Sequence, residues 1–242
     1  MDFSLSEEHK MVQQMVRVFA AREIAPTVAD HDRRQEPDRA LLQKLGAQGI
    51  LGLCIPVRYG GSGMDYISLG LACEELERVD TSARVIMSVH VALNSMALLQ
   101  WATEEQKERF LAPQARGEKL AGFGLTEPGA GSDVAGLSAT ARREGDTYIL
   151  NGEKMWISLA TLADHFLVVA RTDPTAGVRG MTAFVVEQQM PGFTSGSIHG
   201  KLGVRAGDTG WIAMQDTPVP LSHRLGEEGE GFKIAMSCLD NG

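Results

Sequence analysis

The sequence predicts an α+β protein in which an all-helical N-terminal domain is followed by an antiparallel β-barrel domain. Two observations lead to this prediction. Apolar residues recur with helical spacing up to about residue 118, whereas from Leu120 they form short runs rich in Val, Ile, Phe and Thr. No alternation of strands and helices is visible, which argues against a doubly wound nucleotide-binding fold. We therefore expect three segments, at residues 1–118, 119–224 and 225–242, the last being the start of a C-terminal helical domain.

The first helix is expected after Ser4 and Glu7, which have the spacing of a capping box. Val12, Val16 and Phe19 then fall on one face of that helix. Further helices are expected over residues 37–45, 66–79 and 82–101, and from the capping box of Thr103 and Gln106 to about Leu111. The longest of these segments is largely apolar and nearly free of charge, so we expect it to be buried on most sides.

The second half reads as short strands separated by turn residues. Strands are expected over residues 120–125, 138–143, 147–150, 166–171, 182–186 and 211–214. Residues 144–146, Glu-Gly-Asp, have the composition of a hairpin turn. The regular spacing of strands and turns favours a compact antiparallel barrel or sandwich.

The tail returns to helix from Gly231, with Phe232, Met236 and Leu239 on one face. No partner for that face is apparent in the sequence. Two interpretations are open: a further helical segment that would cover it is missing, or the helix docks on the barrel as an ordinary C-terminal helix.

Composition narrows the classes of function. The chain has 242 residues, a net charge of −8 and 27 glycines. The negative charge argues against a nucleic-acid or anionic membrane surface, and no apolar run approaches the ~18 residues needed to span a bilayer. The three cysteines are widely spaced, which fits a reducing compartment. The histidines lack metal-ligand spacing, and residues 30–32 are expected to form a solvated loop. We expect a soluble intracellular protein without a metal site.

Residues 122–136 form a glycine-rich stretch at the end of an expected strand. Gly129 and Gly131 would let the backbone approach a ligand closely, and clustered N–H groups can hold phosphate oxygens. The hydroxyls of Thr126 and Ser132 could hydrogen-bond a heterocycle. On chemistry alone, an ordinary glycine-rich turn between strands is the favoured interpretation of this stretch.

The whole string Thr-Glu-Pro-Gly-Ala-Gly-Ser-Asp at residues 126–133 resembles the signature of the acyl-CoA dehydrogenase family. Two more landmarks of that family follow in order, at residues 151–158 and 201–209, and weaker ones lie at 59–63 and 226–232. Three ordered landmarks are far more specific than one glycine loop. The sequence departs from the family pattern at three positions, with Phe123, Ser158 and Gly207 where relatives commonly have Tyr, Thr and Ser.

The resemblance implies an FAD-binding protein whose flavin ring lies between the barrel and a C-terminal four-helix bundle. Thr126 would hydrogen-bond the pyrimidine side of the flavin, Trp156 would pack on the ring, and Ser158 would donate toward N5. Without the family, Trp156 would be interpreted as a core aromatic residue. The residues implied to bind the cofactor are Phe123, Leu125, Thr126, Gly131, Ser132, Trp156, Ile157 and Ser158. Those implied to bind the substrate are Ser132, Lys201 and Arg205, although the last two could also be solvated charges.

The reaction implied by the resemblance is the α,β-dehydrogenation of an acyl-CoA to its 2-enoyl-CoA. In that family a glutamate removes the α-proton. No glutamate of this chain matches that base, so we expect it beyond residue 242 and assign no catalytic residue within the chain. Glu127 belongs to the signature loop and is not the base. We therefore expect the chain alone to bind FAD weakly and to be unable to turn over substrate.

The resemblance also implies partners and a compartment. The substrate would be an acyl-CoA of fatty-acid or branched-chain amino-acid catabolism, and electron-transfer flavoprotein would accept the electrons. The full-length form would be a homotetramer in the bacterial cytoplasm or a mitochondrial matrix. Two alternatives remain: another flavoenzyme of the superfamily, such as an acyl-CoA oxidase, nitroalkane oxidase or monooxygenase, and a non-catalytic acyl-CoA-binding protein that has kept the fold.

Overall fold

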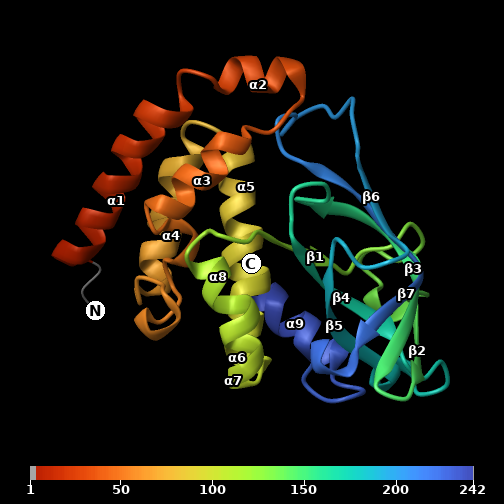
Figure 1. Cartoon of the computed structure of the whole chain (residues 1–242). Coiled ribbons are helices and arrows are strands. Elements are labelled where there is room, and N and C mark those ends of the chain that lie inside the picture. Colours follow the sequence, from red (N-terminus) through yellow and green to blue (C-terminus); the bar gives the residue numbers. More distant parts are fainter. Residues whose placement is uncertain (1–3, 242) are drawn as a thin grey trace.

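The computed structural model describes residues 4–241. Figure 1 shows two parts, a group of helices from the first half of the chain and a twisted sheet from the second half, with the last helix packed where the two parts meet. This arrangement confirms the predicted helical domain followed by a mostly antiparallel sheet.

Helix α1 spans Glu7–Phe19 and begins at Ser6, whose side chain accepts a hydrogen bond from the backbone N–H of His9. The capping box is therefore formed by Ser6 and His9, and the predicted cap at Ser4 was wrong by two residues. The helix buries the predicted face, because Val12, Val16 and Phe19 are all buried. A π-helical turn, η1 (Ala20–Ile24), continues it.

Three helices follow, and two short 3-10 turns lie between the second and the third of them. They are α2 (Val28–Arg34), α3 (Arg39–Ala47) and α4 (Tyr66–Glu77), with η2 (Ile50–Gly52) and η3 (Val57–Tyr59) between the last two. The predicted loop at residues 30–32 is wrong, since it lies inside α2. None of the residues of α2 is buried, so the sequence carries no apolar repeat there.

The predicted long helix is present as α5 (Thr81–Ser88), the π-helical segment η4 (Val89–Ser95) and α6 (Met96–Trp101). By length and composition alone this 21-residue helix could cross a membrane, but 67% of its most apolar window is buried inside the protein. It is therefore best described as a core helix. Thr103 and Gln106 form the predicted capping box of α7 (Glu104–Gln106), which continues as η5 (Lys107–Leu111) and α8 (Ala112–Ala115).

The sheet contains eight strands in the order β6-β7-β3-β2-β4-β5-β8, and β1 pairs with β4 beside this path. The strands are β1 (Ala121–Gly124), β2 (Thr140–Glu144), β3 (Thr147–Ser158), β4 (His165–Arg171), β5 (Met181–Glu187), β6 (Phe193–Ser197), β7 (Thr209–Pro220) and β8 (Arg224–Leu225). Short 3-10 turns lie at η6 (Val134–Gly136), η7 (Gly177–Gly180) and η8 (Leu221–His223). Most neighbours are antiparallel, whereas β1 and β2 each pair with β4 in parallel.

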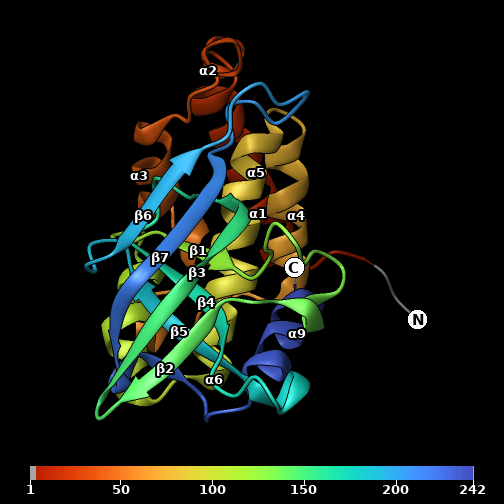
Figure 2. The ribbon, with the colours of Figure 1, turned by 90° about the vertical axis from the view of Figure 1, so that its right-hand side faces the viewer.

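The sheet is not closed into the predicted barrel, because the two ends of its path, β6 and β8, do not pair within residues 4–241. The long strands β3 and β7 form one twisted ribbon (Figure 2). The prediction found six of the strands but missed β6 and β8, which are short and only weakly apolar. The predicted hairpin turn at residues 144–146 joins β2 to β3.

Helix α9 (Gly231–Asn241) confirms the predicted tail helix. One face of it is buried at Ile234, Ala235 and Cys238 in a core shared with the long helix and the sheet. Leu239, on the face that the sequence singled out, is 47% exposed. The same core contains Phe123 of β1, so this strand lies in the layer where helices meet the sheet.

Candidate functional site

The loop after β1 and the end of β3 lie side by side. The backbone N–H of Met155 donates a 2.8 Å hydrogen bond to the carbonyl of Thr126. Four residues earlier, Gly122 lies against β3 so closely that an added Cβ would come within 3.1 Å of the carbonyl oxygen of Ser158. The structure thus brings together two sequence landmarks that are separated by about thirty residues.

Trp156 is the extra residue of a β-bulge. Met155 pairs with Trp211 and Ile157 pairs with Gly210, so Trp156 has no partner on β7. Its backbone is left-handed, with φ of 62°, and its side chain is 61% exposed. Such a conformation is costly for a bulky residue, and bulges re-aim side chains next to functional sites. A strained backbone that presents a large ring to solvent is the arrangement expected where a planar ligand stacks.

A buried ion pair lies beneath the loop. The ammonium of Lys154 donates to a carboxylate oxygen of Glu127 at 2.8 Å and to the carbonyl of Leu125 at 3.2 Å. Glu127 also accepts hydrogen bonds from the backbone N–H and hydroxyl of Ser138 and from the N–H of Ala139. Both charged side chains are nearly inaccessible to water. The pair joins the loop, β3 and the approach to β2 into one unit.

Burial and ion pairing shift the pKa values of Glu127 and Lys154 in opposite directions. Burial alone raises the pKa of Glu127, but the positive charge and hydrogen bond of Lys154, with the donors of Ser138, outweigh it and lower that pKa. Burial lowers the pKa of Lys154 in spite of the opposing effect of Glu127. Glu127 is thus a carboxylate fixed as an acceptor, which supports the prediction that it is not a catalytic base.

The glycine loop itself is open. A Cβ added to Gly129 or Gly131 would meet no atom of the chain within 4 Å, and neither glycine has a positive φ. Neither packing nor backbone conformation within this chain therefore requires glycine at these positions. Ser132 is exposed and Thr126 is half-buried beside them. An accessible loop with small residues and free hydroxyls fits the close approach of a phosphorylated ligand.

Three of the predicted cofactor residues have side chains that face the core. The exposed fractions of Phe123, Leu125 and Ile157 are 8%, 6% and 2%. These residues can therefore line a ligand only through their backbone. Ser158 is half-buried at the end of β3.

The turn after Ser158 is fixed by Asp208, which the sequence analysis did not single out. The carbonyl of Asp208 accepts the N–H of Leu159 at 2.6 Å, and its carboxylate accepts the N–H of Thr161 at 2.7 Å. The hydroxyl of Ser197 donates to the other carboxylate oxygen at 2.7 Å. Leu159 has a left-handed backbone, with φ of 63°. The signal that could have identified Asp208 was its place in the third landmark.

The structure does not bring Lys201 and Arg205 into contact with the Thr126–Trp156 group. Lys201 donates to the carbonyl of Gly207 in its own loop, and burial lowers the pKa of its ammonium. Arg205 lies 3.9 Å from a carboxylate oxygen of Asp32 in α2. Within residues 4–241, no group of three or more His, Cys, Asp and Glu side chains could hold a metal ion.

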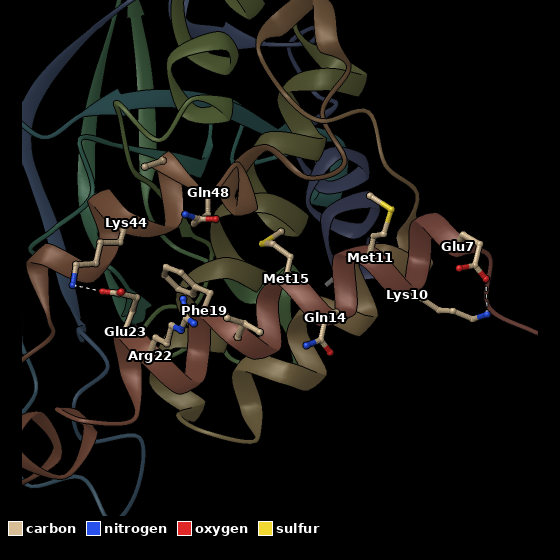
Figure 3. Close-up of a pocket in the computed structure, with 12 residues that line it drawn as sticks. Glu7, Lys10, Met11, Gln14, Met15, Phe19, Arg22, Glu23, Lys44 and Gln48 are labelled. Carbon is tan, nitrogen blue, oxygen red and sulfur yellow. Dashed lines mark hydrogen bonds and ion pairs between the residues drawn. The ribbon is translucent and has the colours of Figure 1, made fainter.

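A separate groove of about 920 Å³ lies between α1 and α3, away from this site (Figure 3). Met11 and Met15 line it, and the ion pair of Lys44 with Glu23 borders one end. Its lining contains none of the predicted site residues.

Comparison with known proteins connects this geometry to a family. The family model of the acyl-CoA dehydrogenase N-terminal domain matches residues 6–118, and that of the middle domain matches residues 122–217. A short-chain-specific acyl-CoA dehydrogenase of Clostridium acetobutylicum is 41% identical over 242 residues, which cover 100% of this chain and 64% of that protein.

Two solved structures share the fold. A chain solved in a study of the electron-transferring flavoprotein of Acidaminococcus fermentans and of flavin-based electron bifurcation is 44% identical, with a TM-score of 0.98, over 100% of this chain and 63% of that one. A glutaryl-CoA dehydrogenase from Mycobacterium smegmatis in complex with FADH2 is 36% identical, with a TM-score of 0.92, over 98% of this chain and 60% of that one.

The helical domain, the mostly antiparallel sheet and the meeting of two landmarks at one accessible surface define an acyl-CoA dehydrogenase fold. The chain belongs to the acyl-CoA dehydrogenase family. It spans 64% of the length of the Clostridium relative.

Proposed function

We propose that this chain supplies the flavin-binding part of an enzyme that dehydrogenates a short-chain acyl-CoA to the 2-enoyl-CoA. The observation that carries the proposal is the 2.8 Å hydrogen bond from Met155 to Thr126, which places the open glycine loop beside the exposed ring of Trp156. The identity with a short-chain-specific relative supports the substrate class.

FAD is the cofactor that the site fits. The backbone of Phe123, Leu125 and Ile157 would run along the flavin, and Thr126 would hydrogen-bond its pyrimidine side. Trp156 would cover the ring and exclude water. Gly131 and Ser132 would hold the pyrophosphate, where an open loop leaves room for it. The FADH2 complex of the Mycobacterium smegmatis relative supports this assignment.

The flavin, when bound, supplies a hydride acceptor for the β-hydrogen of the acyl group. The residues of the chain would orient the flavin and the substrate and exclude water from the ring. The hydroxyl of Ser158 would donate toward flavin N5, where a hydrogen bond tunes the acceptor. Asp208 would keep that hydroxyl in place by fixing the turn after it. Ser132 would also face the substrate, and Lys201 and Arg205 would contribute positive charge for its phosphates from a neighbouring loop.

The α-proton requires a base that we do not assign to any residue of the chain. Glu127 is engaged with Lys154, Ser138 and Ala139, and its side chain is nearly inaccessible. We propose that a glutamate outside these 242 residues fills the role. Electron-transfer flavoprotein would then reoxidise the flavin, a proposal supported by the match to the Acidaminococcus fermentans chain.

The remaining proposals concern organisation. We propose domain limits at residues 1–118, 119–224 and 225–242, assembly as a homotetramer, and a location in the bacterial cytoplasm or a mitochondrial matrix. The boundary near residue 118 falls between the last helix of the first half and β1.

The test uses the chain with and without a completing domain. FAD is added to the chain, and binding is followed by quenching of flavin fluorescence. The chain is then fused to the remaining C-terminal part of the Clostridium relative and assayed with butyryl-CoA and an electron-accepting dye. We expect FAD binding by both proteins and dye reduction by the fusion only. Absence of FAD binding in both, or steady turnover by the chain alone, would contradict the proposal.

The same assay separates the alternatives. Peroxide release in air without dye reduction would indicate an acyl-CoA oxidase. Tight binding of acyl-CoA with no flavin would indicate a non-catalytic binding protein.

A further inference from the structure

We propose that His90 and Asn94, on the π-helical segment of the long helix, are positioning residues for the strand that carries the flavin. The proposal rests on the function argued above and deepens it. Strand β1 pairs with β4 on one edge, and segment η4 lies along β1 (Figure 1).

The two side chains each bind a backbone group of β1. The ring nitrogen Nδ1 of His90 accepts the backbone N–H of Ala121 at 3.1 Å. The amide Nδ2 of Asn94 donates to the carbonyl of Gly122 at 2.8 Å. One acceptor and one donor, four residues apart on one helix face, therefore bind one backbone group in each of two consecutive residues, immediately before residues 123–126, which would face the flavin.

The orientation of both side chains is determined by Gln114. Because Nδ1 of His90 accepts, Nε2 must carry the proton in the neutral ring, and it donates to the carbonyl of Gln114 at 3.2 Å. The side-chain amide of Gln114 donates to Oδ1 of Asn94 at 3.0 Å, which leaves Nδ2 of Asn94 free to face β1. Ser95 donates to Oε1 of Gln114 at 2.7 Å. The hydroxyl of Ser95 also lies 2.9 Å from the carbonyl oxygen of His90, and Nε2 of Gln114 also contacts Nε2 of His165.

All four side chains are almost completely buried. An apolar set of similar volume would pack at least as well, because buried polar groups cost free energy unless they are fully paired. The network is thus expected to specify the position of β1 rather than to add stability. A π-helical segment at this place agrees with that role, since such segments are frequent at functional sites.

The test compares two replacements of the same residue. His90→Asn places Oδ1 near the position of Nδ1 and keeps an acceptor for Ala121, whereas His90→Leu fills more of the volume without an acceptor. Both variants lose the bond to Gln114, so the comparison isolates the contact with β1. If His90 serves only in packing, the Leu variant should bind FAD more tightly than the Asn variant. If His90 positions β1, the Asn variant should bind FAD more tightly than the Leu variant.

Two measurements are made on each variant of the 242-residue chain: FAD affinity, and amide hydrogen exchange over residues 121–126 without FAD. We expect His90→Leu to weaken FAD binding by about tenfold, the effect of one lost buried hydrogen bond, and to speed exchange. His90→Asn should stay within about threefold of the wild type. Met87→Ala is the control, because Met87 is fully buried one turn earlier but packs in the core of the helical domain, away from β1.

The inference is overturned if His90→Leu keeps wild-type exchange, or if Met87→Ala affects residues 121–126 equally. Should the Leu variant fail to fold, Asn94→Ala removes the donor to Gly122 and is measured in the same way. If the wild-type chain binds no FAD, the proposed function fails, while the exchange measurement still decides the role of His90.

Discussion

Lys154 and Glu127 form an ion pair with 0% and 4% of their side chains exposed, directly beneath the backbone of Leu125 and Thr126. Removing one partner leaves a buried, uncompensated charge, so we expect Lys154→Met to lower the free energy of unfolding by about 3–5 kcal/mol. The double variant Lys154→Met with Glu127→Gln should recover a large part of that loss. Equilibrium denaturation of both variants measures the coupling.

A matched surface pair provides the control. Lys119 lies 2.7 Å from Asp164, but its side chain is 49% exposed. Lys119→Met should therefore cost less than about 1 kcal/mol. Equal losses at positions 119 and 154 would show that burial does not govern the strength of these pairs.

The buried histidines predict a specific acid sensitivity. Burial lowers the pKa of His90 to about 4 and that of His165 to about 3, where the charge of nearby His90 adds to the effect. Their unfolded values lie near 6.5. The unfolded chain therefore binds more protons below pH 6.5, and stability falls as pH falls, down to about pH 3. Other charged groups near His165 are Asp164, Lys119 and His223.

The range from pH 6.5 to 5 isolates this effect, because carboxylates are still ionised there. His90 and His165 should each cost roughly 1.5 kcal/mol of unfolding free energy across that range. The slope should be shallower in His90→Asn, which cannot titrate. A slope that is unchanged in this variant would assign the acid sensitivity to other groups.

The glycine loop should separate folding from cofactor binding. Because added Cβ atoms at Gly129 and Gly131 meet nothing within 4 Å, Gly131→Ala should change the unfolding free energy by less than about 0.5 kcal/mol. FAD affinity should nevertheless fall, since the methyl group would occupy space intended for the pyrophosphate. Gly70→Ala in α4, also in open space, is the control and should leave FAD affinity unchanged.

Replacing Trp156 should weaken FAD binding without lowering the stability of the fold. Its ring is 61% exposed and its backbone is left-handed, so glycine suits the conformation better. We expect Trp156→Gly to unfold with a free energy equal to the wild type or up to about 1 kcal/mol higher. FAD should bind more weakly and its fluorescence should be less quenched. A large loss of stability would show that the ring stabilises the fold by packing against the chain, and would contradict a role in ligand binding.

The sequence predicted the elements whose signals are local. The capping box of Thr103 and Gln106 was located correctly because its residues and its bonds lie within four positions of each other. The helix over residues 81–101 was predicted from its apolar length, and the buried face of α1 from its repeat. The short strand β8 and the poorly patterned α2 lacked such signals.

The sequence predicted those parts of the site that lie within the family landmarks. That residues 126–133 and 151–158 belong together followed from the family resemblance, and the hydrogen bond between Thr126 and Met155 bears out their proximity. The bulge at Trp156 could not be predicted, because it depends on how β3 pairs with a strand more than fifty residues later. The open sheet likewise depends on long-range pairing, which periodicity alone does not encode.

The parallel pairing of β1 with β4 has a consequence for the order of folding. Ala121 pairs with His165, so the chain must close a loop of more than forty residues before β1 has a partner. The β2–β3 hairpin and the helices of the first half need only nearby contacts. Segments with long-range contacts assemble late. Strand β1, which would bind the cofactor, is therefore expected to pair after the hairpin and the helices have formed. A ligand that binds there would bind only the fully folded chain and would stabilise it.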